Sequence, residues 1–77
     1  MGCIIGMTKD AEQRKTYWKN QYPELKRWQV FSGPIRSTER AKKMATELAL
    51  EYDCTPDYAE DEHAQADAQW YIYGFKY

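Results

Sequence analysis

The last nine residues, 69–77, most limit what this chain of 77 residues can fold into. Side chains alternate along a strand, so Tyr73 and Phe75 would point to one face and Ile72 to the other. A strand that is apolar on both faces needs cover on both sides, which a position inside a sheet provides. The end of the chain is therefore predicted to form the central strand of a small sheet.

Two further strands and a first helix are predicted upstream. Residues 3–7 form a short apolar run and residues 27–32 an alternating one, and both patterns are typical of strands. Between them, Asp10 and Gln13 have the spacing of a reciprocal helix cap, with Thr8 as the alternative capping residue. Pro23 disfavours helical geometry in the residue before it, so this helix is expected to end there.

A second helix is predicted after a turn at residues 32–34. Ser37 or Thr38 can cap it, and an acidic loop is expected over residues 53–68. Together these elements predict one α+β domain over residues 1–77, with the order β-α-β-α-β, a three-stranded sheet and two main helices. The apolar stripe of the second helix comprises Ala41, Met44, Ala45, Leu48 and Tyr52.

Charge is distributed unevenly along the chain. Residues 1–46 hold ten of the eleven basic residues, and residues 47–77 hold eight of the twelve acidic ones. The two parts could form a phosphate-binding face beside a repelling edge, or could attract one another. The net charge of −1 argues against strong nonspecific binding of nucleic acid. Neither a transmembrane run nor a secretory signal is recognised, so a cytoplasmic protein without a membrane partner is expected.

The cysteine and histidine content argues against a zinc site or a Ser/His triad. Cys3 and Cys54 lack the spacing of metal ligands, and reduced thiols are expected, although one bridge is possible. His63 is the single histidine and lies in an acidic stretch. That stretch lacks the pattern of a calcium loop and is interpreted as a flexible acidic loop, which contains Asp57, Glu60, Asp61 and Glu62.

Arg14 lies eight residues after Gly6, where an apolar run stops and a helix begins. A planar guanidinium near the end of a strand suits recognition of phosphate. The same position also suits a solvated arginine that pairs with Asp10 four residues earlier. Glu47 has the same two interpretations, because it can bind a metal or pair with Lys43 on an exposed flank.

In this order, the pieces resemble a GIY-YIG nuclease domain. Residues 4–8 are similar to the strand end that holds the second motif of that family, and Arg14 stands where the family has its helical arginine. Residues 28–31 and 37–50 resemble the third strand and the helix that carries the metal-binding glutamate. Glu47 matches the position of that glutamate.

The chain departs from the family at both tyrosine motifs. Ile4 replaces the tyrosine of the second motif, and no Gly-Ile-Tyr segment stands upstream of it. The C-terminal segment, residues 70–75, could occupy the place of the missing strand if it docks beside residues 3–7. This is the arrangement that a circular permutation would produce.

The resemblance implies a nuclease that acts on phosphodiesters of DNA or RNA. Glu47 would hold one divalent metal, Mg²⁺ or Mn²⁺, and Arg14 would clamp the phosphate. Tyr71 or Tyr73 would act as the base, and without activity no cofactor is implied. The helix cations expected to contact nucleic acid are Lys15, Lys19, Arg40 and Lys43.

A noncatalytic interaction module is the alternative. Residues 28–48 also resemble half of a SPOR-type peptidoglycan-binding domain, with a strand, a Gly-Pro turn and an alanine-rich helix. A small protein-binding module of phage or mobile-element origin fits equally well, because it requires no particular motif. Under this interpretation Tyr71 and Tyr73 are core rings, and the oligomeric state stays open.

Overall fold

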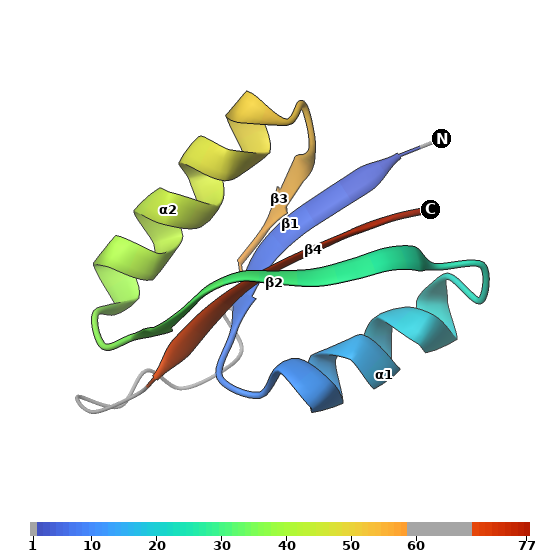
Figure 1. Cartoon of the computed structure of the whole chain (residues 1–77), viewed down its shortest axis with the longest axis horizontal. Helices are drawn as coiled ribbons and strands as arrows, with labels where there is room; N and C mark the ends of the chain where they lie inside the picture. The colour runs from blue at the N-terminus through green and yellow to red at the C-terminus, as the bar shows by residue number, and fades with distance from the viewer. Residues whose placement is uncertain (1, 59–68) are drawn as a thin grey trace.

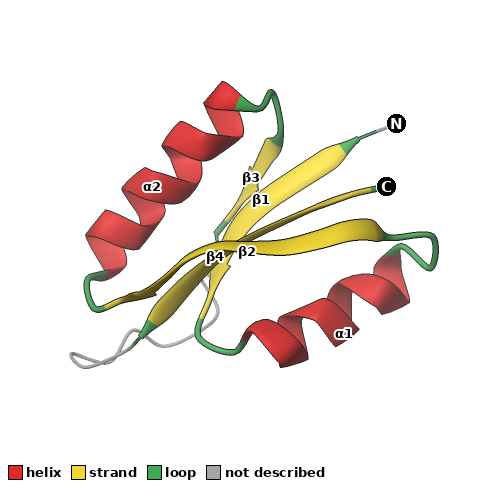
Figure 2. Cartoon of the chain, viewed as in Figure 1, coloured by secondary structure: helices red, strands yellow, loops and turns green. Residues whose placement is uncertain are grey.

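The computed structural model describes residues 2–58 and 69–77, which form two helices and a four-stranded sheet. Figures 1 and 2 show the two helices on either side of this twisted sheet. The elements are β1 (Cys3–Thr8), α1 (Ala11–Gln21), β2 (Lys26–Ile35), α2 (Thr38–Glu51), β3 (Thr55–Asp57) and β4 (Trp70–Lys76).

The C-terminal strand β4 lies inside the sheet, as its two-sided apolar pattern predicts. The strand order is β2-β4-β1-β3, and β4 runs antiparallel to both of its neighbours. Its pairing with β1 runs from Cys3 opposite Lys76 to Thr8 opposite Tyr71. Two backbone hydrogen bonds between Gly2 and Tyr77, of 2.8 and 2.9 Å, continue this pairing to the ends of the chain. The predicted docking of the C-terminal segment beside the first strand is confirmed.

The direction of each crossover places the two helices on opposite faces. The connection through α1 runs from β1 past β4 to β2, whereas the connection through α2 returns across the whole sheet to β3. Crossovers of the same hand that run in opposite directions must lie on opposite faces. The α1 side packs Trp18 against Ile4, Tyr73 and Phe75, while α2 packs against Ile5.

Small residues let α2 lie close to the sheet. Ala41, Ala45 and Ala49 are at most 2 % exposed and follow one another every four residues along the helix. Opposite them, Trp70 is buried, and its Nε1 donates a hydrogen bond of 3.0 Å to Oγ1 of Thr38. The buried stripe is therefore turned toward the alanines relative to the predicted one.

Helix caps form largely as predicted. Asp10 accepts a hydrogen bond of 3.1 Å from the backbone N–H of Gln13, and Ser37 accepts one of 3.2 Å from that of Arg40. Both interactions satisfy backbone donors that the first turn of a helix leaves unpaired. Helix α1 stops at Gln21, two residues before Pro23.

The sheet has four strands, so the predicted three-stranded sheet is corrected. The extra strand β3 contains three residues within the segment interpreted as an acidic loop, and so short a strand leaves no readable alternation. Strand β2 also continues through the predicted turn at residues 32–34, with a φ of 142° at Gly33. Pro34 is tolerated there because β2 is an edge strand. Residues 60–62 and His63 lie outside the described part of the chain.

Cys3 and Cys54 form a disulfide bond, which corrects the expectation of reduced thiols. The parallel pairing of β1 with β3 sets Ile4 opposite Thr55. It thereby brings the preceding residues together, with a Cα–Cα distance of 4.9 Å between the two cysteines. Distance along the sequence conceals this approach, because the bridge spans 51 residues.

Candidate functional site

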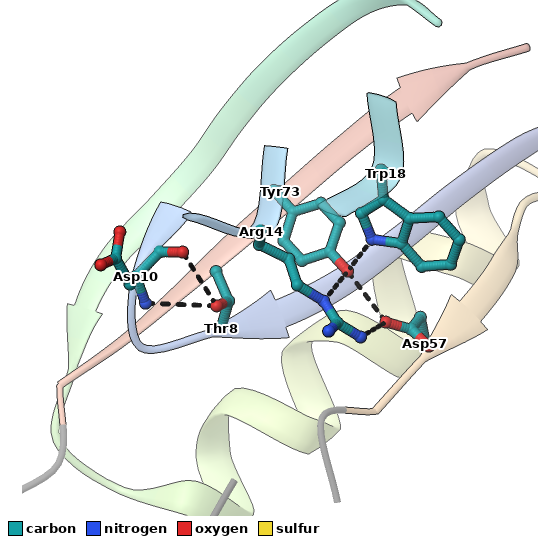
Figure 3. Close-up of polar contacts among 6 residues, drawn as sticks. All are labelled: Thr8, Asp10, Arg14, Trp18, Asp57 and Tyr73. Carbon is teal, nitrogen blue, oxygen red and sulfur yellow. Dashed lines mark hydrogen bonds and ion pairs between the residues drawn. The ribbon is translucent and has the colours of Figure 1, made fainter. Parts of the chain in front are cut away.

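A polar cluster lies where β1, β3 and the first turns of α1 meet (Figure 3). Its members are Arg14 and Trp18 of α1, Asp57 at the end of β3 and Tyr73 in the middle of β4. The Asp10 cap fixes the start of α1, which places Arg14 one turn into the helix and Trp18 one turn later. The crevice beyond the carboxyl ends of parallel strands is where open α/β sheets often bind ligands.

The hydroxyl of Tyr73 is the centre of this cluster. It donates a hydrogen bond of 2.9 Å to Oδ2 of Asp57 and accepts one of 2.8 Å from Nε1 of Trp18. It also accepts a longer one of 3.5 Å from Nε of Arg14. A phenol has one donor and two acceptor positions, so these three partners use its whole capacity. Tyr73 is 0 % exposed.

Arg14 is held by a carboxylate and by aromatic rings. Its Nη2 lies 2.9 Å from Oδ2 of Asp57, and the exposed fractions of the two side chains are 21 % and 26 %. The guanidinium carbon lies 4.5 Å from the ring centre of Tyr17 and 5.5 Å from that of Trp18. This arrangement combines an ion pair with cation–π contacts, and it leaves part of the guanidinium at the surface.

Gly6 makes room for the cluster. A Cβ atom at this position would lie 2.6 Å from the hydroxyl oxygen of Tyr73 and 2.7 Å from the backbone oxygen of Asp57. The missing side chain therefore lets the Tyr73 ring cross β1 and reach Asp57. Gly6, which lies within the first strand, therefore has a packing role beneath the Tyr73 hydroxyl.

The surroundings of Tyr73 and Arg14 raise the pKa of both groups, for different reasons. Loss of hydration raises the pKa of Tyr73 above its ordinary value, and the negative charge of Asp57 adds to this, against the hydrogen bonds from Arg14 and Trp18. Burial alone would lower the pKa of Arg14, but its hydrogen bonds to Tyr73 and Asp57 outweigh that effect and raise it. At neutral pH the phenol is therefore neutral and the guanidinium charged.

Alkaline pH should destabilise the fold through Tyr73. In the unfolded chain the phenol loses its proton near pH 10, whereas the buried phenol retains it. Stability from this group is thus complete below about pH 10 and falls above it, by about 1.4 kcal/mol per pH unit. Urea unfolding between pH 8 and pH 11 is expected to give a shallower pH dependence for Tyr73→Phe than for the wild type. Equal pH dependence of the unfolding free energy in the wild type and Tyr73→Phe would contradict this expectation. The control is Tyr17→Phe, which removes a hydroxyl from a 45 % exposed ring.

The structure brings together two of the residues singled out from the sequence, Arg14 and Tyr73. Tyr71 lies on β4 as well, where it is partly buried and packs against Gly33. Glu47, the predicted metal ligand, is exposed on α2, which covers the opposite face of the sheet from α1. No group of three or more metal-binding side chains is found in residues 2–58 and 69–77.

The cations expected to bind nucleic acid divide between the two helices. Lys15 and Lys19 belong to α1, and Arg40 and Lys43 belong to α2. Because the helices cover opposite faces of the sheet, these four side chains do not share one surface.

Two members of the cluster, Trp18 and Asp57, are not among the predicted site residues. The position of Trp18 four residues after Arg14 is a readable signal, because such residues are neighbours on a helix. Asp57 has no comparable signal, because its place depends on the pairing of β3 with β1.

Comparison with family models, curated proteins and solved structures gives no match. In the part of the chain that the structure describes, no helix is long and apolar enough to cross a membrane.

Proposed function

We propose that this chain is a noncatalytic protein-interaction module. The observation that carries this proposal is the saturated hydroxyl of Tyr73, which is buried and has three hydrogen-bonding partners. A general base must lose its proton near the working pH and reach the water that it activates. Tyr73 instead has a raised pKa and donates a hydrogen bond to Asp57.

The other predicted catalytic groups support the same proposal. The guanidinium of Arg14 already pairs with Asp57, with 2.9 Å between Nη2 and Oδ2, so a phosphate would have to compete with this carboxylate. Glu47 lies on the helix that covers the other face of the sheet. Exposed apolar side chains favour an interaction surface, since Leu50 and Tyr52 at the end of α2 are 78 % and 55 % exposed.

A divalent-metal phosphodiesterase of the GIY-YIG kind is the second candidate. The approach of Arg14 to Tyr73 favours it, because the resemblance assigns those residues to the phosphate clamp and the base. Asp57 would then supply the nearby carboxylate in place of Glu47.

A cytoplasmic location is the expectation from sequence, but the Cys3–Cys54 disulfide favours an oxidising compartment.

A plasmid-nicking assay with Mg²⁺ or Mn²⁺ separates the two candidates. We expect no nicking above the buffer control for the wild type, Tyr73→Phe or Glu47→Ala. We also expect no salt-dependent binding of DNA. Nicking by the wild type that either variant abolishes would overturn the interaction module in favour of the nuclease. Equal nicking by all three proteins would indicate a contaminant.

Stability gives a second readout from the same preparations. Arg14→Met removes the ion pair with Asp57 while keeping much of the side-chain volume. If the cluster serves the fold, this variant should have a lower free energy of unfolding in urea than the wild type. Residues retained for catalysis commonly give the opposite result, because active sites are often strained. A gain in stability for Arg14→Met would therefore count against the interaction module.

A further inference from the structure

We propose that a cleft beside the disulfide binds an acidic peptide of a partner protein through one aromatic side chain. This proposal rests on the proposed function as an interaction module and names the ligand of that module. Its first hollow lies on the α2 side of the sheet, where Ile5 and Phe31 line it, and neither hollow includes Arg14, Asp57 or Tyr73.

Two adjoining hollows form this feature, which we call the disulfide cleft. The first has a volume of about 360 Å³ and includes Phe31, Tyr52 and Gly74 in its lining. The second has a volume of about 440 Å³, and both are lined by Cys3, Arg27 and Lys76. Volumes of this size suit one large side chain together with its flanking backbone.

The floor of the disulfide cleft is apolar and aromatic. The rings of Phe31 and Tyr52 stack with their centres 5.8 Å apart, and Tyr52 is 55 % exposed. Gly74 leaves room for the Phe31 ring to lie against the sheet, because a Cβ atom at this position would lie 2.5 Å from Cε2 of Phe31. A planar side chain placed here would remove both rings from water and find offset or edge contacts with them.

The rim of the cleft carries an excess of positive charge. Lys26 and Lys76 are cross-strand partners in the ladder of β2 with β4, and like charges in that relation destabilise a sheet. Arg27 adds a third cation, and Asp53 is the one acidic residue among those that line the two hollows. Within residues 2–58 and 69–77, these three cations have no ion-pair partner. A carboxylate-bearing ligand would relieve this repulsion.

Backbone strain is located at the same rim. Arg27 has a φ of 58° and Asp53 a φ of 55°, both in the left-handed region. For a long side chain such as arginine this conformation is unfavourable, because its Cβ atom crowds the backbone. Arg27 lies at the register shift between Lys26 and Gln29, and bulges of this kind commonly redirect a side chain near a binding site. From this position Arg27 lines both hollows of the cleft.

The combination of features favours a peptide over nucleic acid. The cations form one short group around a ring-sized apolar floor, whereas a nucleic-acid strand needs a track of positive charge along its backbone. The cations predicted for that role divide between α1 and α2, on opposite faces of the sheet. An aromatic residue with carboxylates on both sides matches the floor and the rim together.

Peptide titration followed by NMR of the backbone amides tests this proposal. The probe is acetyl-Asp-Glu-Phe-Asp-Glu-amide, and its matched controls replace phenylalanine by alanine or all four acids by lysine. We expect the probe to shift amides of residues 27–31, 52–54 and 74–76, with a Kd on the order of 100 μM. Each control peptide should bind at least roughly tenfold more weakly, because each lacks one of the two contacts.

Two variants locate the site without disturbing the fold. Arg27→Gly keeps the left-handed backbone and removes the cation, and should weaken the probe roughly fivefold. Arg36→Ala removes an exposed cation that does not line the cleft and should leave Kd unchanged. Equal loss in both variants would overturn the assignment to the cleft.

Other outcomes are equally decisive. Absence of shifts up to about 5 mM probe, or shifts confined to another surface, would overturn the proposal. Binding of a thymidine oligonucleotide at the cleft, with no binding of the probe, would replace the peptide by nucleic acid. The nicking assay is independent, so a failed titration without nicking rejects this ligand and leaves the noncatalytic function in place.

Discussion

Replacing Cys3 and Cys54 together by alanine is expected to lower the free energy of unfolding by about 4 kcal/mol. The disulfide closes a loop that spans 51 residues, so it removes much conformational freedom from the unfolded chain. A domain of this size typically has a total stability of about 4–12 kcal/mol. Loss of the bridge should therefore leave the fold marginal or unfolded at physiological temperature.

Urea unfolding of the oxidised protein, the reduced protein and the double variant measures this effect. The reduced wild type should unfold at nearly the same urea concentration as the variant, and reductant should not change the variant further. Equal midpoints for the oxidised wild type and the variant would show that the bridge contributes little. Addition of reductant to the wild type is the matched control, because it breaks the bond without changing the sequence.

Gly6→Ala is expected to cost about 3 kcal/mol through overpacking and loss of hydrogen bonds. The new methyl group would lie 2.6 Å from the Tyr73 hydroxyl and 2.7 Å from a backbone oxygen of β3. The backbone oxygen is held by strand pairing, so the hydroxyl must move away from Asp57 and Trp18. The buried indole N–H of Trp18 would then lose its partner.

Urea unfolding and tryptophan fluorescence measure this change, with Gly2→Ala as the control. A methyl group at Gly2 would also lie close to a tyrosine, 2.6 Å from a ring atom of Tyr77. The close atoms at Gly2 all belong to the outer end of the Tyr77 side chain and none to the backbone, so the ring can turn aside and the loss of stability should be much smaller. Equal losses in the two variants would contradict the role assigned to Gly6.

The elements that depend on local patterns could be predicted from the sequence. The two-sided apolar pattern of residues 70–75 placed β4 inside the sheet, and the capping residues Asp10 and Ser37 marked the helix starts. Docking of β4 beside β1 also predicted that Arg14 and a C-terminal tyrosine would meet. These features follow from side-chain alternation and from the hydrogen bonds that helix termini require.

Features that depend on distant pairing could not be predicted. Strand β3 has three residues, yet its pairing with β1 brings Asp57 to Arg14 and Cys54 to Cys3. The side of the sheet that α2 covers likewise depends on the position of β3, because the crossover must reach it. The family resemblance assigned the carboxylate of the site to Glu47, whereas Asp57 is the carboxylate that pairs with Arg14.

The backbone contact between Gly2 and Tyr77 has a practical consequence for attaching this domain to anything else. Both residues also line the second hollow of the disulfide cleft, so a polypeptide fused at either end would emerge next to the proposed ligand site. An affinity tag left in place could cover that site and conceal binding. Conversely, the paired ends would let the whole domain be inserted into a surface loop of a host protein through two short joints.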